Sequence, residues 1–283
     1  MKLNSLQIYP KGHLAQSNWY RLTQELTSIQ VSAATITLVY KPCVVKMIPK
    51  LSILNDKHIE HILNEKEISK MYNDYMAASR KSTITEQFLN FDSTQFETKQ
   101  DEQNLYFFMD FFPGGDLANL FTNCRINMSL TDIKNYLAEI ILSLEVLHSN
   151  NVVYRDLKLE NFVIDKTGHC RLIDFGFSKR LHSERTYTRC GTEGYIAPEI
   201  IKNLGHGLPS DIWSLGILFC NMVSGVIPNT KNNLKKVYML LKKDIYAKDF
   251  IEKCLNVDPL SRPTIEEVKR HGYFKDIDWE KIK

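Results

Sequence analysis

Apolar and polar positions divide the chain into a first part of short extended runs and a second part of helices. Between Thr131 and Asn150 the apolar residues recur three and four positions apart, which predicts an amphipathic helix with one buried face. Thr131 is the expected N-cap of this helix, and Asp132 follows it where the helix dipole favours a negative charge. Another helix is expected to begin near Ser210, directly after Pro209.

The extended runs precede these helices. Val31–Tyr40 and Cys43–Ile48 are expected to form strands, and a polar helix is expected around Asp56–Met71. Leu105–Met109 predicts a buried strand that runs into the breakers of Pro113–Gly115. The expected fold class is therefore α+β, with a strand-rich lobe joined to a mainly helical lobe. A cleft between two such lobes is a common place for a ligand.

The composition is that of an ordinary folded domain, with 283 residues, 43% of them hydrophobic and 24% charged. Lys and Arg together number 36 and Asp and Glu 33, an excess of 36 − 33 = 3 that is too small to imply a nucleic-acid partner. Five lysines could still form a basic patch, and we interpret them as a solvated helix face: Lys231, Lys235, Lys236, Lys242 and Lys243.

The six cysteines show neither a CxxC pair nor a spacing typical of metal ligands, so we expect reduced thiols. The N-terminus lacks the apolar segment of a secretion signal, and no apolar run reaches the roughly 18 residues that a membrane helix needs. These features predict an intracellular protein of the cytoplasm or nucleus, with no membrane partner. They leave the oligomeric state open.

A cluster of polar residues follows the amphipathic helix. Asp156, Lys158 and Asn161 fall within six residues, and two strand-like runs joined by a turn then lead to Asp174. Because such a turn brings the outer ends of two strands together, Asp174 should return to the neighbourhood of Asp156 and Asn161. Two carboxylates, an amide and an ammonium are the set that phosphoryl transfer to a hydroxyl needs. A hairpin decorated with polar residues is the alternative, and the complete spaced set favours the chemical interpretation.

Three motifs occur in order in this part of the chain: Tyr154-Arg155-Asp156-Leu157-Lys158-Leu159-Glu160-Asn161, Asp174-Phe175-Gly176-Phe177 and Arg189-Cys190-Gly191-Thr192. They resemble the eukaryotic protein kinases, and within them the AGC group close to the cyclic-nucleotide-dependent kinases. The resemblance spans roughly Tyr20 to the C-terminus. It implies a bilobal protein-kinase fold with an N-terminal, nucleotide-binding lobe at 1–109, a hinge at 110–115 and a C-terminal lobe at 116–283.

The resemblance assigns roles to the polar cluster. Asp156 is the implied catalytic base, Lys158 steadies the transferring phosphoryl group, and Asn161 and Asp174 hold Mg²⁺, with Mn²⁺ as a second possibility. Lysine two residues after the base marks kinases that phosphorylate serine and threonine. The implied reaction is ATP-dependent phosphorylation of a protein substrate.

The nucleotide side departs from the family pattern. Lys46 resembles the strand lysine that contacts the α- and β-phosphates, and Glu65 matches its helix partner. The family's glycine-rich loop is replaced by Leu26, Thr27, Ser28, Ile29, Gln30, Val31, Ser32, Ala33 and Ala34, with Thr27, Ile29 and Ser32 at the glycine positions. We expect this loop to be stiffer and to cradle phosphates less closely. The implied adenine pocket consists of Leu26, Ala34, Val44 and Met109, with hinge backbone from Asp110 to Phe112.

The altered loop leaves two functional interpretations. The chain is either an active kinase with weakened ATP affinity or a pseudokinase that uses the fold as a binding scaffold. The presence of the complete set Lys46, Glu65, Asp156, Lys158, Asn161 and Asp174 favours activity. A small-molecule phosphotransferase is disfavoured, because Ala197-Pro198-Glu199 and a full activation segment are typical of kinases that bind peptides.

Regulation and substrate choice follow from the same resemblance. Thr188 stands at the phosphorylated position of the activation loop, and the residues expected to bind that phosphate are His61, Arg155 and Lys179. The expected substrate-binding residues are Asp116, Glu160 and Thr192, and the two acidic ones predict a preference for Arg or Lys before the target residue. Glu199 and Arg262 resemble the family's buried structural ion pair.

Two further departures concern length. The C-terminal tail of AGC kinases is not expected after Asp278, and Tyr72–Asn104 is longer and more polar than relatives need. Compactness combined with the altered loop also resembles virus-encoded kinases, the baculoviral protein kinases among them. That resemblance implies a basic, Arg-rich substrate of the DNA-packaging type and a setting in the host nucleus.

Overall fold

The computed structural model describes residues 6–8, 18–22, 27–31, 34–38, 43–79, 96–124, 128–228, 231–242 and 244–282. The chain forms two compact units. The first comprises Met1–Glu60 and Asn73–Phe111, and the second comprises His61–Tyr72 and Phe112–Lys283. The boundary at Phe111 falls within residues 110–115, where the linker was predicted.

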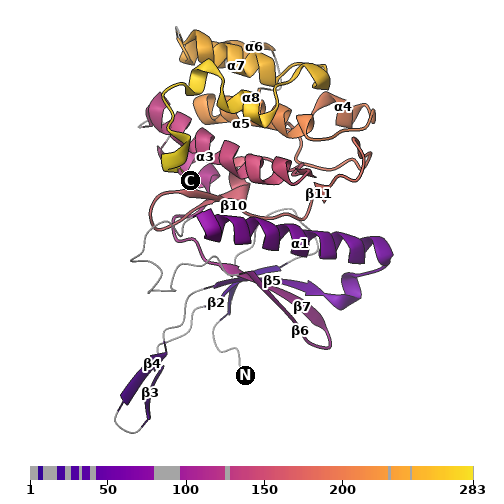
Figure 1. Cartoon of the computed structure of the whole chain (residues 1–283), viewed down its shortest axis with the longest axis vertical. Helices are drawn as coiled ribbons and strands as arrows, with labels where there is room; N and C mark the ends of the chain where they lie inside the picture. The colour runs from indigo at the N-terminus through magenta and orange to yellow at the C-terminus, as the bar shows by residue number, and fades with distance from the viewer. Residues whose placement is uncertain are drawn as a thin grey trace. The chain divides into compact units, whose positions relative to one another are not determined.

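The first unit is built on an antiparallel sheet of five strands in the order β1-β2-β5-β7-β6 (Figure 1). The strands are β1 (Leu6–Ile8), β2 (Asn18–Leu22), β5 (Cys43–Pro49), β6 (Phe96–Gln100) and β7 (Asn104–Asp110). β5 lies in the middle, and its register sets Lys46 opposite Trp19 of β2 and Phe107 of β7. The strands predicted at 43–48 and 105–109 are confirmed, although within β7 only Phe107 is buried.

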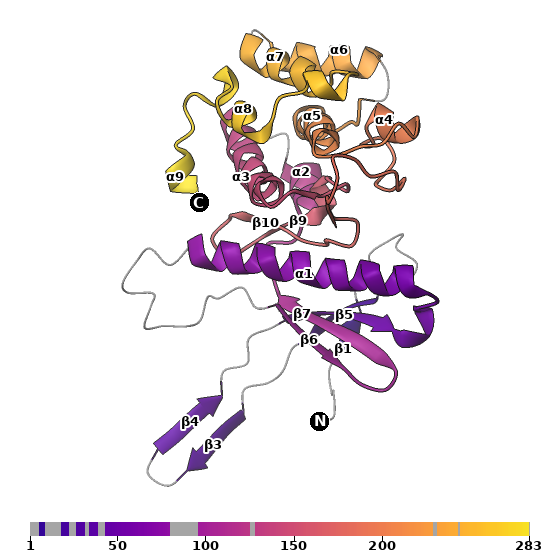
Figure 2. The same ribbon diagram turned by 45° about the vertical axis from the view of Figure 1, so that its right-hand side comes forward.

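Two other strands of this unit pair only with each other. β3 (Thr27–Val31) and β4 (Ala34–Leu38) form an antiparallel ladder that Figure 2 draws separately from the larger sheet. The strand predicted at 31–40 is therefore confirmed only over Ala34–Leu38. Val31 belongs to β3 and is the register partner of Ala34.

The long helix α1 (Asp56–Ser79) follows a 3₁₀ turn at Lys50–Ser52. Its start agrees with the predicted helix, but it continues past Met71 to Ser79. The part between His61 and Tyr72 groups with the second unit. Ile68 and Tyr72 on that part are buried, which explains why a helix with a mostly polar sequence is held in place.

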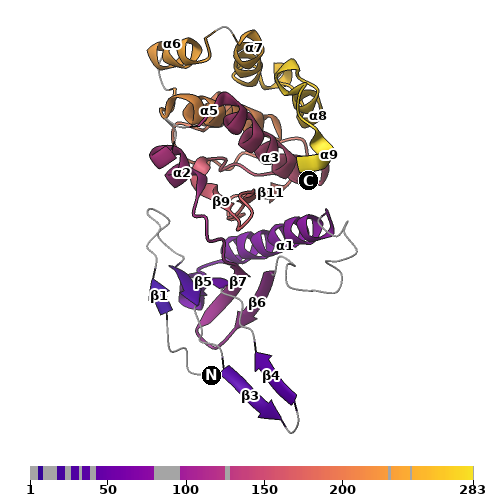
Figure 3. The same cartoon turned by 90° about the vertical axis from the view of Figure 1, so that its left-hand side faces the viewer.

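The second unit is mainly helical, and Figure 3 shows α3 beside α5. Its helices are α2 (Leu117–Cys124), α3 (Leu130–Ser149), α4 (Pro198–Ile201), α5 (Pro209–Ser224), α6 (Lys231–Leu240), α7 (Ile245–Cys254), α8 (Ile265–Lys269) and α9 (Trp279–Ile282). Short 3₁₀ turns occupy Leu159–Asn161, Pro259–Ser261 and Gly272–Phe274. Two small antiparallel ladders pair β8 (Val152–Val153) with β11 (Lys179–Arg180) and β9 (Phe162–Ile164) with β10 (Cys170–Leu172).

Helix α3 carries the predicted buried face, and Leu137, Ile140 and Leu144 are fully enclosed. Its predicted N-cap was wrong. Ser129 caps the helix: its hydroxyl accepts from the backbone N–H of Asp132, and the Asp132 carboxylate accepts from the backbone N–H of Ser129. This reciprocal capping box satisfies two backbone donors, which Thr131 inside the first turn has no position to do.

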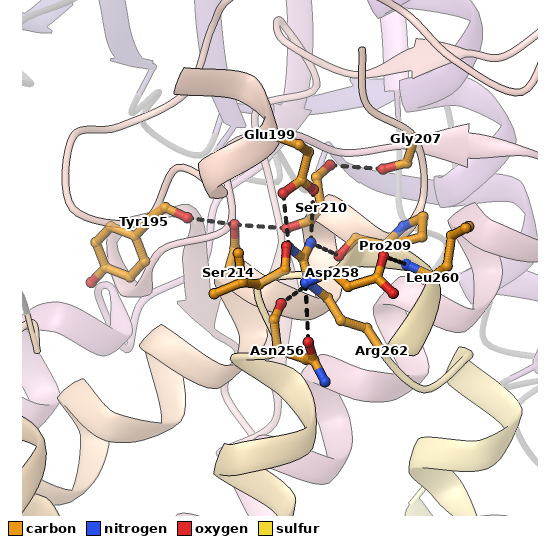
Figure 4. A network of polar contacts seen from close by, with 11 residues as sticks. Tyr195, Glu199, Gly207, Pro209, Ser210, Ser214, Asn256, Asp258, Leu260 and Arg262 are labelled. Atoms are coloured by element: carbon orange, nitrogen blue, oxygen red, sulfur yellow. Dashed lines mark hydrogen bonds and ion pairs between the residues drawn. The ribbon is translucent and has the colours of Figure 1, made fainter. Parts of the chain in front are cut away.

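The predicted pair of Glu199 and Arg262 is present and buried (Figure 4). Two guanidinium nitrogens donate to the two carboxylate oxygens at 2.7 and 2.8 Å. The same guanidinium also donates to the carbonyls of Pro209 and Asn256 at 2.9 and 2.8 Å. One side chain therefore joins the start of α4, the start of α5 and the turn after α7.

Several composition-based expectations have a structural counterpart. All six cysteines are free thiols. Lys235 and Lys236 are exposed on α6, in agreement with a solvated helix face. Among the described residues, none of the helices has the length and apolar character needed to cross a bilayer.

Candidate active site

Three donors surround one buried carboxylate of the segment 154–161, which lies between β8 and β9. Two of the donors belong to this segment and the third is Thr192. Asp156 is 3% exposed. Its Oδ2 lies 2.8 Å from Lys158 Nζ and accepts from Asn161 Nδ2 at 2.9 Å, while its Oδ1 accepts from Thr192 Oγ1 at 2.6 Å. A carboxylate with this many donors is fixed in orientation.

Thr192 closes the arrangement. It donates to Asp156 and accepts from Lys158 Nζ at 2.8 Å, so the carboxylate, the ammonium and the hydroxyl form a triangle. The sequence assigned Thr192 to substrate binding. In the structure it also determines where the Asp156 and Lys158 side chains point.

Asp174 reaches this region through the β9–β10 ladder. Leu172 pairs with Phe162, and the next residue, Ile173, donates its N–H to the carbonyl of Asn161 at 2.9 Å. Asp174 follows in the left-handed region with φ of 62°. The predicted return of the second strand to the polar cluster is therefore confirmed, and the positive φ turns the chain sharply at the carboxylate.

The side chains of Glu65 on α1 and of Asp174 both lie next to Gly176. A Cβ placed on Gly176 would lie 3.3 Å from Asp174 Oδ1 and 3.6 Å from Glu65 Oε2. Glycine at 176 thus leaves room for two acidic side chains beside the turn. Glu65 is itself buried, at 7% exposed.

Phe175 is buried between two tyrosine rings. Its ring centroid lies 5.1 Å from that of Tyr72 on α1 and 6.0 Å from that of Tyr154. The Tyr154 hydroxyl donates to the carbonyl of Ile173 at 2.7 Å, and burial raises its pKa well above the ordinary value, so it stays a protonated donor. These contacts hold the backbone on either side of Asp174.

A second buried carboxylate, on α5, holds the backbone of the segment 154–161. Asp211 on α5 accepts from the backbone N–H groups of Tyr154 and Arg155 at 2.8 and 2.9 Å, and its Oδ2 lies 2.9 Å from His148 Nε2. Arg155 adopts φ of 70°, and these bonds hold that strained turn. The sequence predicted only a helix that begins near Ser210, and its one signal for the role of Asp211 was an acid at the start of an apolar helix.

The segment after Asp174 is fastened to α1 and to the end of α3. Asn64 Nδ2 donates to the carbonyl of Ser178 at 2.6 Å. Arg180 Nη1 donates to the carbonyl of Asn150 at 2.8 Å, and its Nη2 lies 3.4 Å from a carboxylate oxygen of Glu67. These links tie the position of the Glu65 helix to the conformation of the activation segment.

Thr188 lies further along this segment with an exposed side chain. Of the residues predicted to bind its phosphate, Arg155 and Lys179 are partly buried and His61 is exposed on α1. Arg155 Nε donates to the carbonyl of Phe177 at 2.6 Å, and Lys179 Nζ donates to Thr186 Oγ1 at 3.2 Å. Arg155 and Lys179 thus converge on the activation segment.

The predicted acidic substrate residues differ in their surroundings. Asp116 caps α2, because its carboxylate accepts from the backbone N–H and the side-chain amide of Asn119, both at 2.8 Å. Glu160 is exposed on the 3₁₀ turn of the catalytic segment. Asn221 Nδ2 donates to the Tyr195 hydroxyl at 2.8 Å.

The predicted nucleotide-binding residues belong to the first unit. Val44 and Met109 are register partners on β5 and β7, as are Cys43 and Asp110, so part of the predicted adenine pocket is brought together. Lys46 is buried on β5. The predicted phosphate loop forms β3 and the start of β4, and Leu26, Ser32 and Ala33 lie outside the described residues. The Lys46–Glu65 ion pair stays a prediction.

The donor set near Asp156 fits a hard divalent cation. Asn161 commits its amide nitrogen to the carbonyl and carboxylate of Asp156, which leaves its side-chain oxygen for a cation. Asp174 follows Ile173, whose N–H donates to the backbone carbonyl of Asn161. Mg²⁺ prefers one or two such oxygens together with water and substrate phosphates. The described residues contain no group of three or more His, Cys, Asp and Glu side chains that could form an all-protein cage.

Comparison with known proteins agrees with this geometry. Residues 30–274 match the family model "Protein kinase domain". The cAMP-dependent protein kinase catalytic subunit PRKX of Homo sapiens is 36% identical over 252 residues, covering 82% of this chain and 70% of the relative. The cAMP-dependent protein kinase catalytic subunit of Dictyostelium discoideum is 37% identical over 253 residues, covering 84% of this chain and 36% of the relative.

A relative from another branch is also similar: ribosomal protein S6 kinase alpha-3 of Mus musculus is 38% identical over 201 residues, covering 65% of this chain and 27% of the relative. The family match covers most of the chain and includes every residue of the polar cluster around Asp156. The chain belongs to the protein kinase family and is a serine/threonine kinase of the AGC group.

Proposed function

We propose that this kinase phosphorylates basic proteins, with Asp156 as the base that receives the substrate hydroxyl. The observation that carries the proposal is the closed set of contacts among Asp156, Lys158, Thr192 and Asn161. Protein kinases use ATP and a divalent metal ion, and protein substrates follow from the family. The preference for basic substrates and the role of each residue are our proposal.

In the proposed mechanism the buried Asp156 carboxylate orients the serine or threonine hydroxyl and accepts its proton during transfer. Lys158, held by Asp156 and Thr192, presents its ammonium to the transferring phosphoryl group. Asn161 and Asp174 would hold Mg²⁺, which when bound neutralises charge on the ATP phosphates. Lys46 would contact the α- and β-phosphates, with Glu65 as the ion-pair partner that holds its ammonium. Catalysis then rests on positioning and electrostatic stabilisation.

Substrate preference is proposed to come from Glu160 and Asp116. Glu160 is the middle residue of the 3₁₀ turn Leu159–Asn161, and its exposed carboxylate could pair with an arginine that precedes the target residue. Asp116 presents a second carboxylate at the start of α2. Both positions therefore favour a cationic peptide.

An oriented peptide library tests this preference. We expect selection for Arg or Lys upstream of the target and no demand for an apolar residue after it. Glu160→Gln should weaken the basic selection about 10-fold, the size of one charge-assisted contact. Glu266→Gln, an equally exposed change on α8, should leave the selection intact. A library without upstream basic preference contradicts the proposal.

The glycine-free phosphate loop is proposed to weaken ATP binding without preventing transfer. Thr27 and Ile29 stand where the family has glycine, and their side chains limit how closely the backbone can approach phosphates. Ile29→Gly should therefore lower the KM for ATP several-fold while kcat changes little, which steady-state kinetics would measure. An unchanged or raised KM would show that this loop does not cover the phosphates.

Thr188 is proposed to be the activating phosphorylation site. A phosphate there carries about −1.5 to −2 charges at neutral pH and would meet Arg155 and Lys179, which already converge on the activation segment. Since this segment is fastened to α1 through Asn64 and Arg180, ordering it would also position Glu65. If Thr188→Ala keeps full activity and phosphate mapping finds Thr188 unmodified in the wild type, the proposed switch is contradicted.

A further inference from the structure

The surroundings of the activation segment contain buried nitrogens that lack hydrogen-bond partners. In the part of the chain that the structure describes, Arg155 Nη1 and His206 Nε2 are two such atoms. His206 is 3% exposed. A buried polar group without a partner costs free energy, and its presence in a folded protein points to a ligand or ion that completes it.

The two nitrogens belong to one small region. Thr186 and His206 form an isolated antiparallel bridge in which each backbone N–H donates to the other's carbonyl at 2.8 Å. Lys179 Nζ donates to the hydroxyl of Thr186 at 3.2 Å, so its ammonium contacts the residue that pairs with His206. Both Arg155 and Lys179 act electrostatically on the His206 imidazole.

Residues 205–207 also pack against the part of the activation segment that leads to Thr188. A Cβ placed on Gly205 would lie 2.9 Å from the Tyr187 ring, and one placed on Gly207 would lie 2.7 Å from the carbonyl of Glu184. Residues 205–207 therefore line residues 184–187 closely. Thr188 is two residues beyond Thr186, a span of about 7 Å that a phosphorylated side chain can bridge.

We propose that His206 is a ligand of the phosphate on Thr188, with Nε2 of the protonated imidazole donating to a phosphate oxygen beside Arg155 Nη1 and Lys179 Nζ. This inference rests on the proposed phosphorylation of Thr188. The ligand class is a phosphate monoester dianion, and His206 is a positioning residue because it acts on the activation segment. Nothing in the sequence motif marked it, since the predicted phosphate ligands were His61, Arg155 and Lys179.

The charges around His206 make its protonation depend on the phosphate. Burial comes first among the causes that lower its pKa to about 4, and the positive charges of Arg155 and Lys179 act in the same direction. Asp211 and Glu199 act in the opposite direction, which is insufficient to reverse the effect. From the activation segment, the groups next to residues 205–207 are Glu184, Arg185 and Tyr187. Without an anion the imidazole is therefore neutral at pH 7.

A phosphate dianion changes this balance, because it offsets the two cations and accepts a hydrogen bond from an imidazolium. The imidazole then takes up one proton from water, so phosphate ligation is coupled to proton uptake. The pKa of His206 is raised in the phosphorylated form relative to the unphosphorylated one. Its contribution is therefore present below that raised pKa and is lost as the pH rises through it.

The test uses the full chain with phosphothreonine installed chemically at position 188, so it does not depend on which enzyme adds the phosphate. With ¹⁵N-labelled histidine, the Nε2 resonance of His206 should titrate with a pKa near or above the ordinary histidine value of about 6.5 in the phosphorylated chain. In the unphosphorylated chain it should titrate near 4. A merely structural histidine would show the same titration in both forms, and that result would overturn the proposal.

Variants give a second readout. In the wild type the increase in Tm on phosphorylation should be larger at pH 6.5 than at pH 8.5, and His206→Gln should abolish this pH dependence. His182→Gln, an exposed histidine of the same segment, should retain it. If His206→Gln keeps the full pH dependence, His206 is not the ligand. Separately, finding Thr188 unmodified in the enzyme isolated from cells would contradict the proposed switch and not the ligand assignment.

Discussion

At the scale of single residues, the main feature of the candidate active site is a set of hydrogen bonds that Asp156, Lys158 and Thr192 make with one another. Thr192 donates to Asp156 and accepts from Lys158, while Lys158 also contacts Asp156 directly. Each group therefore restrains the other two. For the proposed role of Asp156 as the base, this restraint means that its carboxylate needs no reorganisation when the substrate hydroxyl arrives.

Replacing Thr192 tests this restraint. Thr192→Val keeps the shape and removes the hydroxyl, so Lys158 and Asp156 each lose a hydrogen bond of the charge-assisted kind. We expect kcat to fall by about 10- to 100-fold, from roughly 1.5–3 kcal/mol per charged contact. Thr192→Ser restores the hydroxyl and should recover most of the rate. Equal kcat for the Val and Ser variants would mean that the triangle has no catalytic role.

The sequence indicated which residues close together in the chain form one polar cluster, and it did not indicate residues that reach the cluster from other elements. Asp156, Lys158 and Asn161 lie within six residues, so their spacing was visible in the sequence. Asp211 reaches the same loop from a helix that begins at Pro209, and its partner His148 sits at the end of another helix. Nothing local in the sequence reports such long-range hydrogen bonds.

At the scale of elements, the boundaries of helices were less predictable than their existence. The buried face of α3 followed directly from the spacing of its apolar residues. Its cap did not, because serine, threonine and aspartate all favour caps and three of them occur between Ser129 and Asp132. The choice depends on backbone conformation, and Ser129 has the extended backbone that an N-cap requires.

A pair of substitutions separates the two capping assignments. Ser129→Ala removes the side-chain acceptor of the capping box and should lower the free energy of unfolding by about 1 kcal/mol. Thr131→Ala, in the first turn and exposed, should change it by less than about 0.5 kcal/mol. Urea unfolding followed by circular dichroism measures both. A larger effect at Thr131 than at Ser129 would reverse the assignment.

The Glu199–Arg262 pair joins three elements and was predicted as structural. Arg262→Ala leaves the Glu199 carboxylate buried without its partner, so we expect a loss of about 3–5 kcal/mol in the free energy of unfolding. Lys281→Ala breaks the exposed pair with Asp278 and serves as the control, with an effect of at most about 0.5 kcal/mol. Similar effects of the two changes would show that the buried pair contributes little.

At the scale of the whole molecule, the sequence predicted a strand-rich part followed by a helical part, and the two units of the structure have this character. The middle of α1, His61–Tyr72, groups with the helical unit although it follows the strands in the sequence. Its contacts explain this grouping: the Tyr72 hydroxyl lies 2.9 Å from Ser143 Oγ, and its ring packs on Phe175. Hydrophobic periodicity shows which face of a helix is buried and not which partner buries it.

The central claim is that the chain transfers phosphate through Asp156 despite its altered phosphate loop. The most direct measurement is transfer of labelled γ-phosphate from ATP to a basic protein, comparing the wild type with Asp156→Asn at equal concentration and with matching circular dichroism spectra. Asparagine keeps the shape of Asp156 and removes the charge that accepts the proton. The account predicts transfer by the wild type and a loss of at least about 100-fold in the variant. Equal transfer by the two proteins, or none by the wild type, would contradict it.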